Sequence, residues 1–152
     1  LVTQNGYPAW HYMLAGRTPL SEFSNLKRSH NHVMMGSIDA WFFQTLAGIH
    51  VDEKRPGYEP ILIDPFVPDA LDSVQASVTT PRGPVKVAWK KKNQTCTYTI
   101  EIPANTTARL SLPAAVLERV KAEPPCEFTR TRGDRITCQI GSGRYAVEVG
   151  NF

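Results

Sequence analysis

The sequence lacks any apolar run of the length, about 20 residues, that a membrane-spanning helix requires, and no signal peptide opens it. The sequence also lacks a strong excess of either charge, because 17 Lys and Arg are nearly balanced by 14 Asp and Glu, for a formal net charge of +3. These absences predict neither a membrane nor a nucleic-acid partner. The first residue is not methionine, so we expect a chain that was cut from a longer protein or has lost its N-terminus.

Cysteine is also scarce, and its three positions, Cys96, Cys126 and Cys138, show no CxxC spacing. The spacing therefore predicts no metal site, no redox motif and no cofactor. Cys96 and Cys138 each lie in phase with apolar residues two positions away, which predicts that both point into a core as small hydrophobes. A disulfide between these two cysteines is an open alternative.

The N-terminal third has helical periodicity. Apolar residues follow Pro8 at helical spacing as far as Gly16, which predicts one short helix. A second helix is predicted from about Asn31 to a stop signal at Gly48, with the pattern reaching Ile49. Its apolar stripe consists of Met34, Ile38, Trp41, Phe42 and Leu46. Further apolar residues lie beside this stripe, and a helix so apolar belongs inside a larger helical assembly.

From about Gly57 onward the apolar residues alternate with polar ones, which is typical of half-buried strands. Turn residues separate the alternating runs, so we expect seven or eight short antiparallel strands in a β-sandwich. A helical turn is a further expectation around residues 116–120. The alternating runs are centred on Ala76, Val87, Tyr98, Leu110, Cys138 and Val147, and the predicted interior is Val78, Val87, Trp89, Ile100, Leu110, Ile140 and Val147.

Prolines mark the junction between the two patterns. Pro56, Pro60, Pro65 and Pro68 surround the short apolar run 61–63, which we interpret as the first strand after a stiff connector. The predicted fold class is α+β, with helices in residues 1–52 and an antiparallel sandwich in residues 53–152. The dense basic run 90–92 is predicted to lie at a hairpin turn as a solvated loop, and Arg132-Gly133-Asp134 is predicted to form another turn.

Several phrases resemble the closing part of bacterial α-L-rhamnosidases. They keep their order from near residue 5 to residue 149, so the resemblance covers almost the whole chain. The resemblance implies the last helices of an (α/α)6 catalytic barrel followed by its C-terminal β-sandwich, with the earlier barrel helices as the missing partners of the apolar helix. The phrases are Gly6-Tyr7-Pro8, Ser29-His30-Asn31-His32, Met35-Gly36-Ser37, Leu46-Ala47-Gly48-Ile49, Pro56-Gly57-Tyr58, Thr79-Thr80-Pro81-Arg82-Gly83, Ile102-Pro103-Ala104-Asn105-Thr106-Thr107-Ala108 and Gly141-Ser142-Gly143-Arg144-Tyr145.

The resemblance also implies a catalytic carboxylate. By this resemblance, family members place the general base between the first helix and the Ser-x-Asn-His phrase. In this chain Glu22 stands at that position. Without the resemblance, a Glu in a polar loop is most often a solvated side chain. Family members usually carry Trp directly before this Glu and Thr two residues earlier. In this chain Ser21 stands at the Trp position and Pro19 at the Thr position. Both differences change the expected wall of the sugar subsite.

Three further residues are substrate-binding candidates, the first of them by the same resemblance. His32 matches a family histidine that faces the bound sugar, and its alternative role is a backbone hydrogen bond at a helix start. Asn31 is a candidate helix cap that holds His32 in place. Trp10 is either part of a sugar subsite or a core residue, and its helical spacing favours the core.

The function that the resemblance implies is an inverting α-L-rhamnosidase acting on a rhamnose-containing glycan or glycoside. The general acid would lie in the absent part of the barrel, so the piece alone is expected to be inactive. The expected partners are the remainder of the barrel and, through the exposed helical face, a second copy of the chain. The alternatives are a non-catalytic carbohydrate-binding or structural sandwich, or a barrel glycosidase of other specificity. A binding module would need exposed aromatics, yet Trp89, Tyr98 and Tyr145 alternate in phase with the predicted core.

Overall fold

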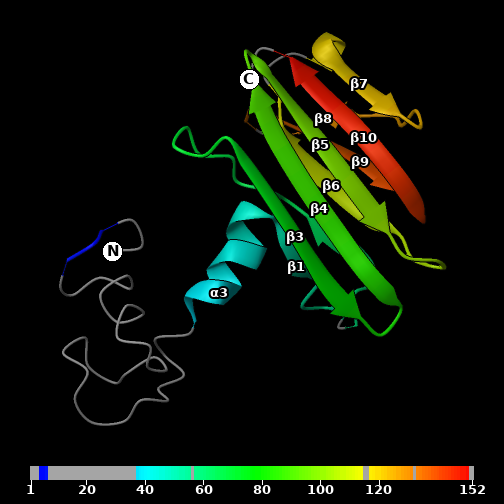
Figure 1. Cartoon of the computed structure of the whole chain (residues 1–152). Helices are drawn as coiled ribbons and strands as arrows, with labels where there is room; N and C mark the ends of the chain where they lie inside the picture. Colours follow the sequence, from blue (N-terminus) through cyan, green and yellow to red (C-terminus); the bar gives the residue numbers. More distant parts are fainter. Residues whose placement is uncertain (1–3, 7–36, 56, 115–116, 132, 151–152) are drawn as a thin grey trace, which may run out of the picture. The chain divides into compact units, whose positions relative to one another are not determined.

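The computed structural model describes residues 4–6, 37–55, 57–114, 117–131 and 133–150. The chain divides into two units, Leu1–Trp41 and Phe42–Phe152. In the first unit the described residues include one helical segment, α3 (Ile38–Trp41), as Figure 1 shows. Among the described residues no helix combines the length and apolar character that crossing a membrane requires.

The second unit is built from two β-sheets, in accord with the predicted sandwich (Figure 1). It opens with a π-helical turn, η1 (Phe42–Leu46), and later contains the 3-10 turn η2 (Leu117–Arg119). One sheet has the strand order β1-β2-β6-β9-β8, and the other has the order β3-β4-β5-β10-β7. In chain order the strands are β1 (Ile49–Val51), β2 (Ile61–Ile63), β3 (Ser73–Thr80), β4 (Gly83–Lys92), β5 (Thr95–Ile102), β6 (Ala108–Pro113), β7 (Val120–Glu123), β8 (Thr129–Arg130), β9 (Arg135–Ile140) and β10 (Gly143–Gly150).

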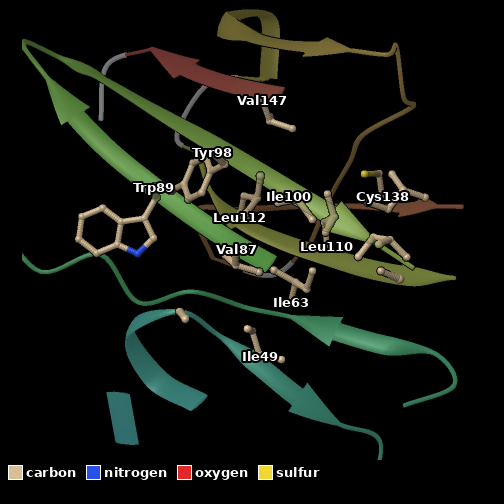
Figure 2. Packing of buried hydrophobic residues seen from close by; sticks show 14 of the residues in the cluster. Ile49, Ile63, Val87, Trp89, Tyr98, Ile100, Leu110, Leu112, Cys138 and Val147 are labelled. Carbon is tan, nitrogen blue, oxygen red and sulfur yellow. The ribbon is translucent and has the colours of Figure 1, made fainter. Parts of the chain in front are cut away.

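The core lies between the two sheets (Figure 2). Successive side chains of a strand point to opposite faces, so alternation in the sequence puts one set inside and the other outside. The prediction is confirmed for six interior residues, which are buried, while Val78 is half-buried because β3 is an edge strand. The six are Val87, Trp89, Ile100, Leu110, Ile140 and Val147.

The sheets differ from the predicted antiparallel sandwich in one pairing. Strand β2 lies parallel to β6, while all other strand pairs in the described sheets are antiparallel. The chain leaves the first sheet after β2, forms β3 to β5 in the second sheet, and returns as β6. This excursion lets two strands run in the same direction, which a short hairpin does not allow.

Two local predictions were wrong. The helical pattern was expected to reach Ile49, but the helix ends at Leu46, and Ile49 begins β1, which pairs with β2. The basic run 90–92 was assigned to a solvated loop, but it forms the end of β4. Lys91 donates through Nζ to the carbonyl oxygens of Pro68 and Asp69, at 2.8 and 3.0 Å. The turn itself follows at Asn93, which has a positive φ of 51°.

Candidate functional site

The four site residues predicted from the sequence, Trp10, Glu22, Asn31 and His32, all lie outside the described residues. The described structure therefore contributes the framework that follows them along the chain. Two parts of this framework carry specific polar contacts, namely the junction at Thr45–Gly48 and a loop cluster around Arg82. Hollows lie beside the junction and on the outer faces of the two sheets.

The junction is the place where η1 gives way to β1. Trp89 Nε1 donates to the carbonyl oxygen of Leu46 at 2.8 Å, and both residues are buried. The amide of Phe66 donates to the carbonyl of Thr45 at 2.9 Å, and the amide of Asp64 donates to the carbonyl of Gly48 at 2.8 Å. The carbonyl groups at the end of a helix have no partner within it, and here the carbonyls of Thr45, Leu46 and Gly48 accept hydrogen bonds from the sandwich.

Gly48 is the one position of the junction where a side chain would not fit. Its φ is +72°, and an added Cβ would lie 2.2 Å from the backbone nitrogen of Pro65 and 2.3 Å from the carbonyl carbon of Asp64. Glycine takes this left-handed conformation without steric cost, and only glycine allows so close an approach of two backbones. The predicted stop signal is therefore also a packing requirement.

An apolar hollow of about 250 Å³ lies beside the junction, within the second unit. Its walls are η1 side chains and one end of β3, namely Phe42, Phe43, Leu46, Val74, Gln75 and Ala76. Phe43 is 39% exposed, a large fraction for a phenylalanine in a helical turn. This part of the sandwich thus presents an incompletely covered apolar surface.

Three distant segments converge on Arg82, and two of them, residues 79–83 and 102–108, are phrases that resemble the family. Its Nη1 donates to the carbonyl oxygen of Asn105 at 3.3 Å, and its Nη2 forms an ion pair with Glu59. Gly83 packs closely against the same loop, because a Cβ there would lie 3.0 Å from Cβ of Pro103. Arg82 thereby ties the β3–β4 turn and the β5–β6 loop to the connector before β2.

A hollow of about 430 Å³ on the outer face of the first sheet has charges of both signs. It includes His50, Asp52, Glu53, Lys54, Asp64 and Arg109. Burial lowers the pKa of His50, so the neutral imidazole is favoured there. Arg135 pairs with Asp64 and donates from Nε to Ser111 Oγ at 2.8 Å, and burial lowers the pKa of its guanidinium. Mixed charge in one hollow favours no single class of ligand.

Four aromatic residues of the described strands and loops, Trp89, Tyr98, Phe128 and Tyr145, form no exposed platform for stacking sugars. Trp89 and Tyr98 are fully buried, and Tyr145 and Phe128 are half-buried against the core. Among the described residues the Tyr98 hydroxyl has no nitrogen or oxygen partner, and the Cys96 thiol is its polar neighbour. Burial raises the pKa of Tyr98. These positions confirm the prediction, from alternation, of interior aromatics.

The three cysteines are free. Cys96 and Cys138 are buried, as predicted, but they lie in different sheets, in β5 and β9, and form no disulfide. Burial raises the pKa of Cys138 to about 12, with a further contribution from the neighbouring Cys126. Such thiols are weak nucleophiles near neutral pH. Within the described residues no group of three or more His, Cys, Asp or Glu is placed to hold a metal ion.

Sequence reasoning missed the polar contacts of the junction and of Arg82. Gly48 was recognised as a stop signal and Arg82 as part of a turn, but neither pattern names the partner that each residue meets. Both residues lie inside phrases that resemble the family, and this position was the available signal.

Comparisons with known proteins place this framework in a family. The model of the bacterial α-L-rhamnosidase C-terminal domain matches residues 48–125. An α-L-rhamnosidase of Formosa agariphila is 38% identical over 127 residues, which cover 78% of this chain and 13% of the relative. The crystal structure of Streptomyces avermitilis α-L-rhamnosidase complexed with L-rhamnose matches with a TM-score of 0.80 and 26% identity, over 98% of this chain and 15% of that one.

A second solved structure agrees. The α-L-rhamnosidase from Dictyoglumus thermophilum matches with a TM-score of 0.75 and 27% identity, over 99% of this chain and 18% of that one. The chain therefore spans 13–18% of the length of these three proteins.

Proposed function

Because the chain belongs to the bacterial α-L-rhamnosidase C-terminal domain family, we propose that it is the closing part of an inverting α-L-rhamnosidase. The complete enzyme would release terminal L-rhamnose from a glycan or glycoside. The observation that carries the proposal is the match to a rhamnose-bound rhamnosidase over 98% of this chain, which includes residues before the sandwich. The domain boundary at residues 52 and 53 stays a prediction from the sequence.

Inversion requires two carboxyl groups about 6.5–9.5 Å apart, so that a water molecule fits between the base and the sugar. We assign the base to Glu22, whose carboxylate would deprotonate this water as it attacks the anomeric carbon. The general acid, which protonates the leaving oxygen, would come from the earlier part of the barrel. The 152 residues by themselves would then lack the general acid and would be inactive.

His32 and Asn31 would position the sugar rather than exchange protons with it. An imidazole N–H donates to a sugar hydroxyl in both the ground state and the transition state. Asn31 would cap the helix that carries His32, and Trp10 would place an aromatic face against the apolar face of the sugar.

A non-catalytic carbohydrate-binding sandwich of the aromatic-platform type is the alternative of another class. The burial of Trp89 and Tyr98 disfavours it. A barrel glycosidase of other specificity differs from the proposal in its substrate, and the Ser-x-Asn-His phrase at residues 29–32 favours the rhamnosidase.

The stereochemistry of the product tests the proposed mechanism. The full-length enzyme is given an aryl α-L-rhamnoside, and the anomeric proton of the released sugar is followed by NMR before mutarotation. We expect the β anomer to appear first, because a single displacement by water inverts the configuration. Initial release of the α anomer would overturn inversion, and hydrolysis of an aryl α-glucoside in preference to the rhamnoside would overturn the substrate assignment.

A further inference from the structure

The outer face of the second sheet has a hollow of about 550 Å³ whose lining combines polar side chains with the apolar residues Val74, Ala88 and Trp89, from three adjacent strands. Its size lies within the range of about 300–1,000 Å³ that is usual for small-molecule sites. The cross-strand register explains its layout. One row runs across the sheet through Ser73, Lys90 and Thr97, and the next row runs through Gln75, Ala88 and Thr99.

The hollow forms because a small side chain stands among longer ones. Ala88 is the middle residue of its row, and its methyl group leaves the floor low between Gln75 and Thr99. Lys90 and Lys92 follow on the same face of β4, because alternate residues of a strand share a face. Three strands span about 10 Å across the sheet and two residues about 7 Å along it, which suits one or two sugar units.

The charges of this face are unevenly distributed. Lys86, further along β4, donates to both carboxylate oxygens of Glu101 at 3.2 and 3.3 Å, and Arg144 donates to the same carboxylate at 2.9 Å. Within the described part of the chain, Lys90 and Lys92 take part in no ion pair. The hollow thus joins two ammonium groups that form no ion pair to three hydroxyls and one amide, and Glu148 on β10 pairs in register with Thr97 at its border.

We propose that this hollow binds an acidic saccharide, that is, a sugar carrying a carboxylate or a sulfate. Lys90 and Lys92 would donate to the anionic group, and Ser73, Gln75, Thr97 and Thr99 would exchange hydrogen bonds with the ring hydroxyls. Charge-assisted bonds from ammonium to carboxylate or sulfate are stronger than bonds between neutral groups. The site needs no aromatic platform and does not depend on the proposed hydrolytic function.

The same observations disfavour a nucleic acid as the occupant. Binding to a phosphate backbone draws on many basic contacts along a stripe, whereas this face offers two lysines without an ion pair, and the next cations, Lys86 and Arg144, are both bound to Glu101. Hydroxyl and amide groups around a low floor suit a polyhydroxylated ligand of limited size.

Titration of the full chain with defined saccharides tests the proposal. The probes are tetragalacturonate, a sulfated galactose tetrasaccharide, neutral galactotetraose and a twelve-nucleotide oligothymidylate, each followed by amide NMR at low salt. We expect saturable shifts with one or both acidic tetrasaccharides, confined to residues 73–75, 88–92 and 97–99. Whichever acidic probe binds identifies the anionic group that the site accepts.

Two variants separate the site from general attraction of charge. The double variant Lys90→Gln/Lys92→Gln removes both ammonium groups, and Ala88→Leu fills the floor without changing the charge. Each is expected to weaken binding by about tenfold or more, since each removes a distinct part of the site. Lys86→Gln is the matched control from the same strand and face, and it should leave the dissociation constant within about twofold.

Thermal unfolding of each variant verifies that the fold is kept, and exposed lysines of a strand are tolerant of glutamine. The proposal is overturned if neither acidic tetrasaccharide binds saturably, or if galactotetraose or the oligothymidylate binds as tightly as they do. It is also overturned if Lys86→Gln weakens binding as much as the double variant, because the attraction would then belong to the whole face.

Discussion

At the scale of single residues, two buried aromatic side chains of the same sheet differ in how their polar atoms are satisfied. Trp89 on β4 donates its indole N–H to the Leu46 carbonyl at 2.8 Å. Tyr98 lies directly opposite on β5, and among the described residues its hydroxyl meets no nitrogen or oxygen partner. A buried polar group stabilises a fold only when its partner is present, so the two residues give a matched test of this junction contact.

We expect Trp89→Phe to lower the free energy of unfolding by about 2–4 kcal/mol, since it leaves the Leu46 carbonyl buried without a donor and reduces the packed volume. Tyr98→Phe removes a hydroxyl that lacks a nitrogen or oxygen partner. Its expected cost is below about 1 kcal/mol. Urea unfolding of the two variants measures both values. Equal losses would mean that the indole hydrogen bond contributes nothing to the junction.

Glu22 is the residue on which the proposed chemistry depends. In the full-length enzyme, Glu22→Gln keeps the shape of the side chain and removes the base, so kcat should fall by about 10²–10⁴-fold. Glu22→Gly with added azide should restore turnover and give a glycosyl azide of inverted configuration, because a small anion can occupy the place of the water. Glu53→Gln is a control with the same change in charge. Full activity in Glu22→Gln would place the base elsewhere.

His32 is expected to behave differently from Glu22. A contact that positions the sugar acts in both the ground state and the transition state, so His32→Ala should raise KM as well as lower kcat. Steady-state kinetics on an aryl α-L-rhamnoside separates the two constants. A fall in kcat with an unchanged KM would assign His32 to the chemical step instead.

At the scale of elements, the end of η1 shows what a short segment needs in order to change direction. Gly48 has a φ of +72°, and a Cβ added there would lie 2.2 Å from the backbone nitrogen of Pro65 and 2.3 Å from the carbonyl carbon of Asp64. Gly133, in the turn between β8 and β9, has a φ of +73° with open space around it. The two glycines share a conformation but differ in their surroundings.

Alanine at these two positions therefore separates conformational strain from collision. Gly133→Ala should cost about 1–2 kcal/mol, the usual cost of a left-handed conformation for a residue with a side chain. Gly48→Ala carries this cost and must also displace a backbone, so we expect a loss that exceeds the Gly133→Ala value by at least about 2 kcal/mol. Chemical denaturation compares the two. Similar losses would show that the backbone at Asp64 and Pro65 moves away at little cost.

The sequence predicted the long strands better than the short ones for a physical reason. β4 and β5 contain several periods of alternation, so Val87 and Ile100 could be placed inside with their neighbours. β8 has two residues, and β7 has only two apolar positions, too few to define a period. Ile49–Val51 follows an apolar helical pattern after only two residues, Ala47 and Gly48, and the positive φ at Gly48 marks the change of direction.

Strand pairing and the candidate catalytic residues were harder to predict from the sequence than the alternation of buried and exposed residues. The parallel pairing of β2 with β6 joins segments that are distant in sequence, and no local pattern encodes it. A carboxylate in a polar loop carries no periodic mark either. Glu22 and His32 were therefore identified only through the resemblance to a family, and they remain predictions.

At the scale of the whole molecule, the unit that contains the sandwich begins at Phe42, before the predicted domain boundary. Ala47 and Ile49 belong to the core, and β1 covers the edge of β2. The acceptor for the Trp89 indole, the Leu46 carbonyl, also lies in this segment. Residues 42–52 thus contribute to the stability of the sandwich, although their apolar pattern continues that of the preceding helix.

Two truncated chains test this assignment, because they share residues 53–152 and differ only in residues 42–52. The chain of residues 42–152 should unfold in one cooperative transition, since it keeps the core cluster complete. The chain of residues 53–152 loses Ala47, Ile49, the acceptor for Trp89 and the strand that covers β2. We expect it to be less stable by at least about 3 kcal/mol and to self-associate through the uncovered edge strand, which urea unfolding and light scattering would detect. If both chains have the same unfolding midpoint, β1 and the junction contacts stabilise the sandwich little, and the boundary at residues 52 and 53 describes the independent domain.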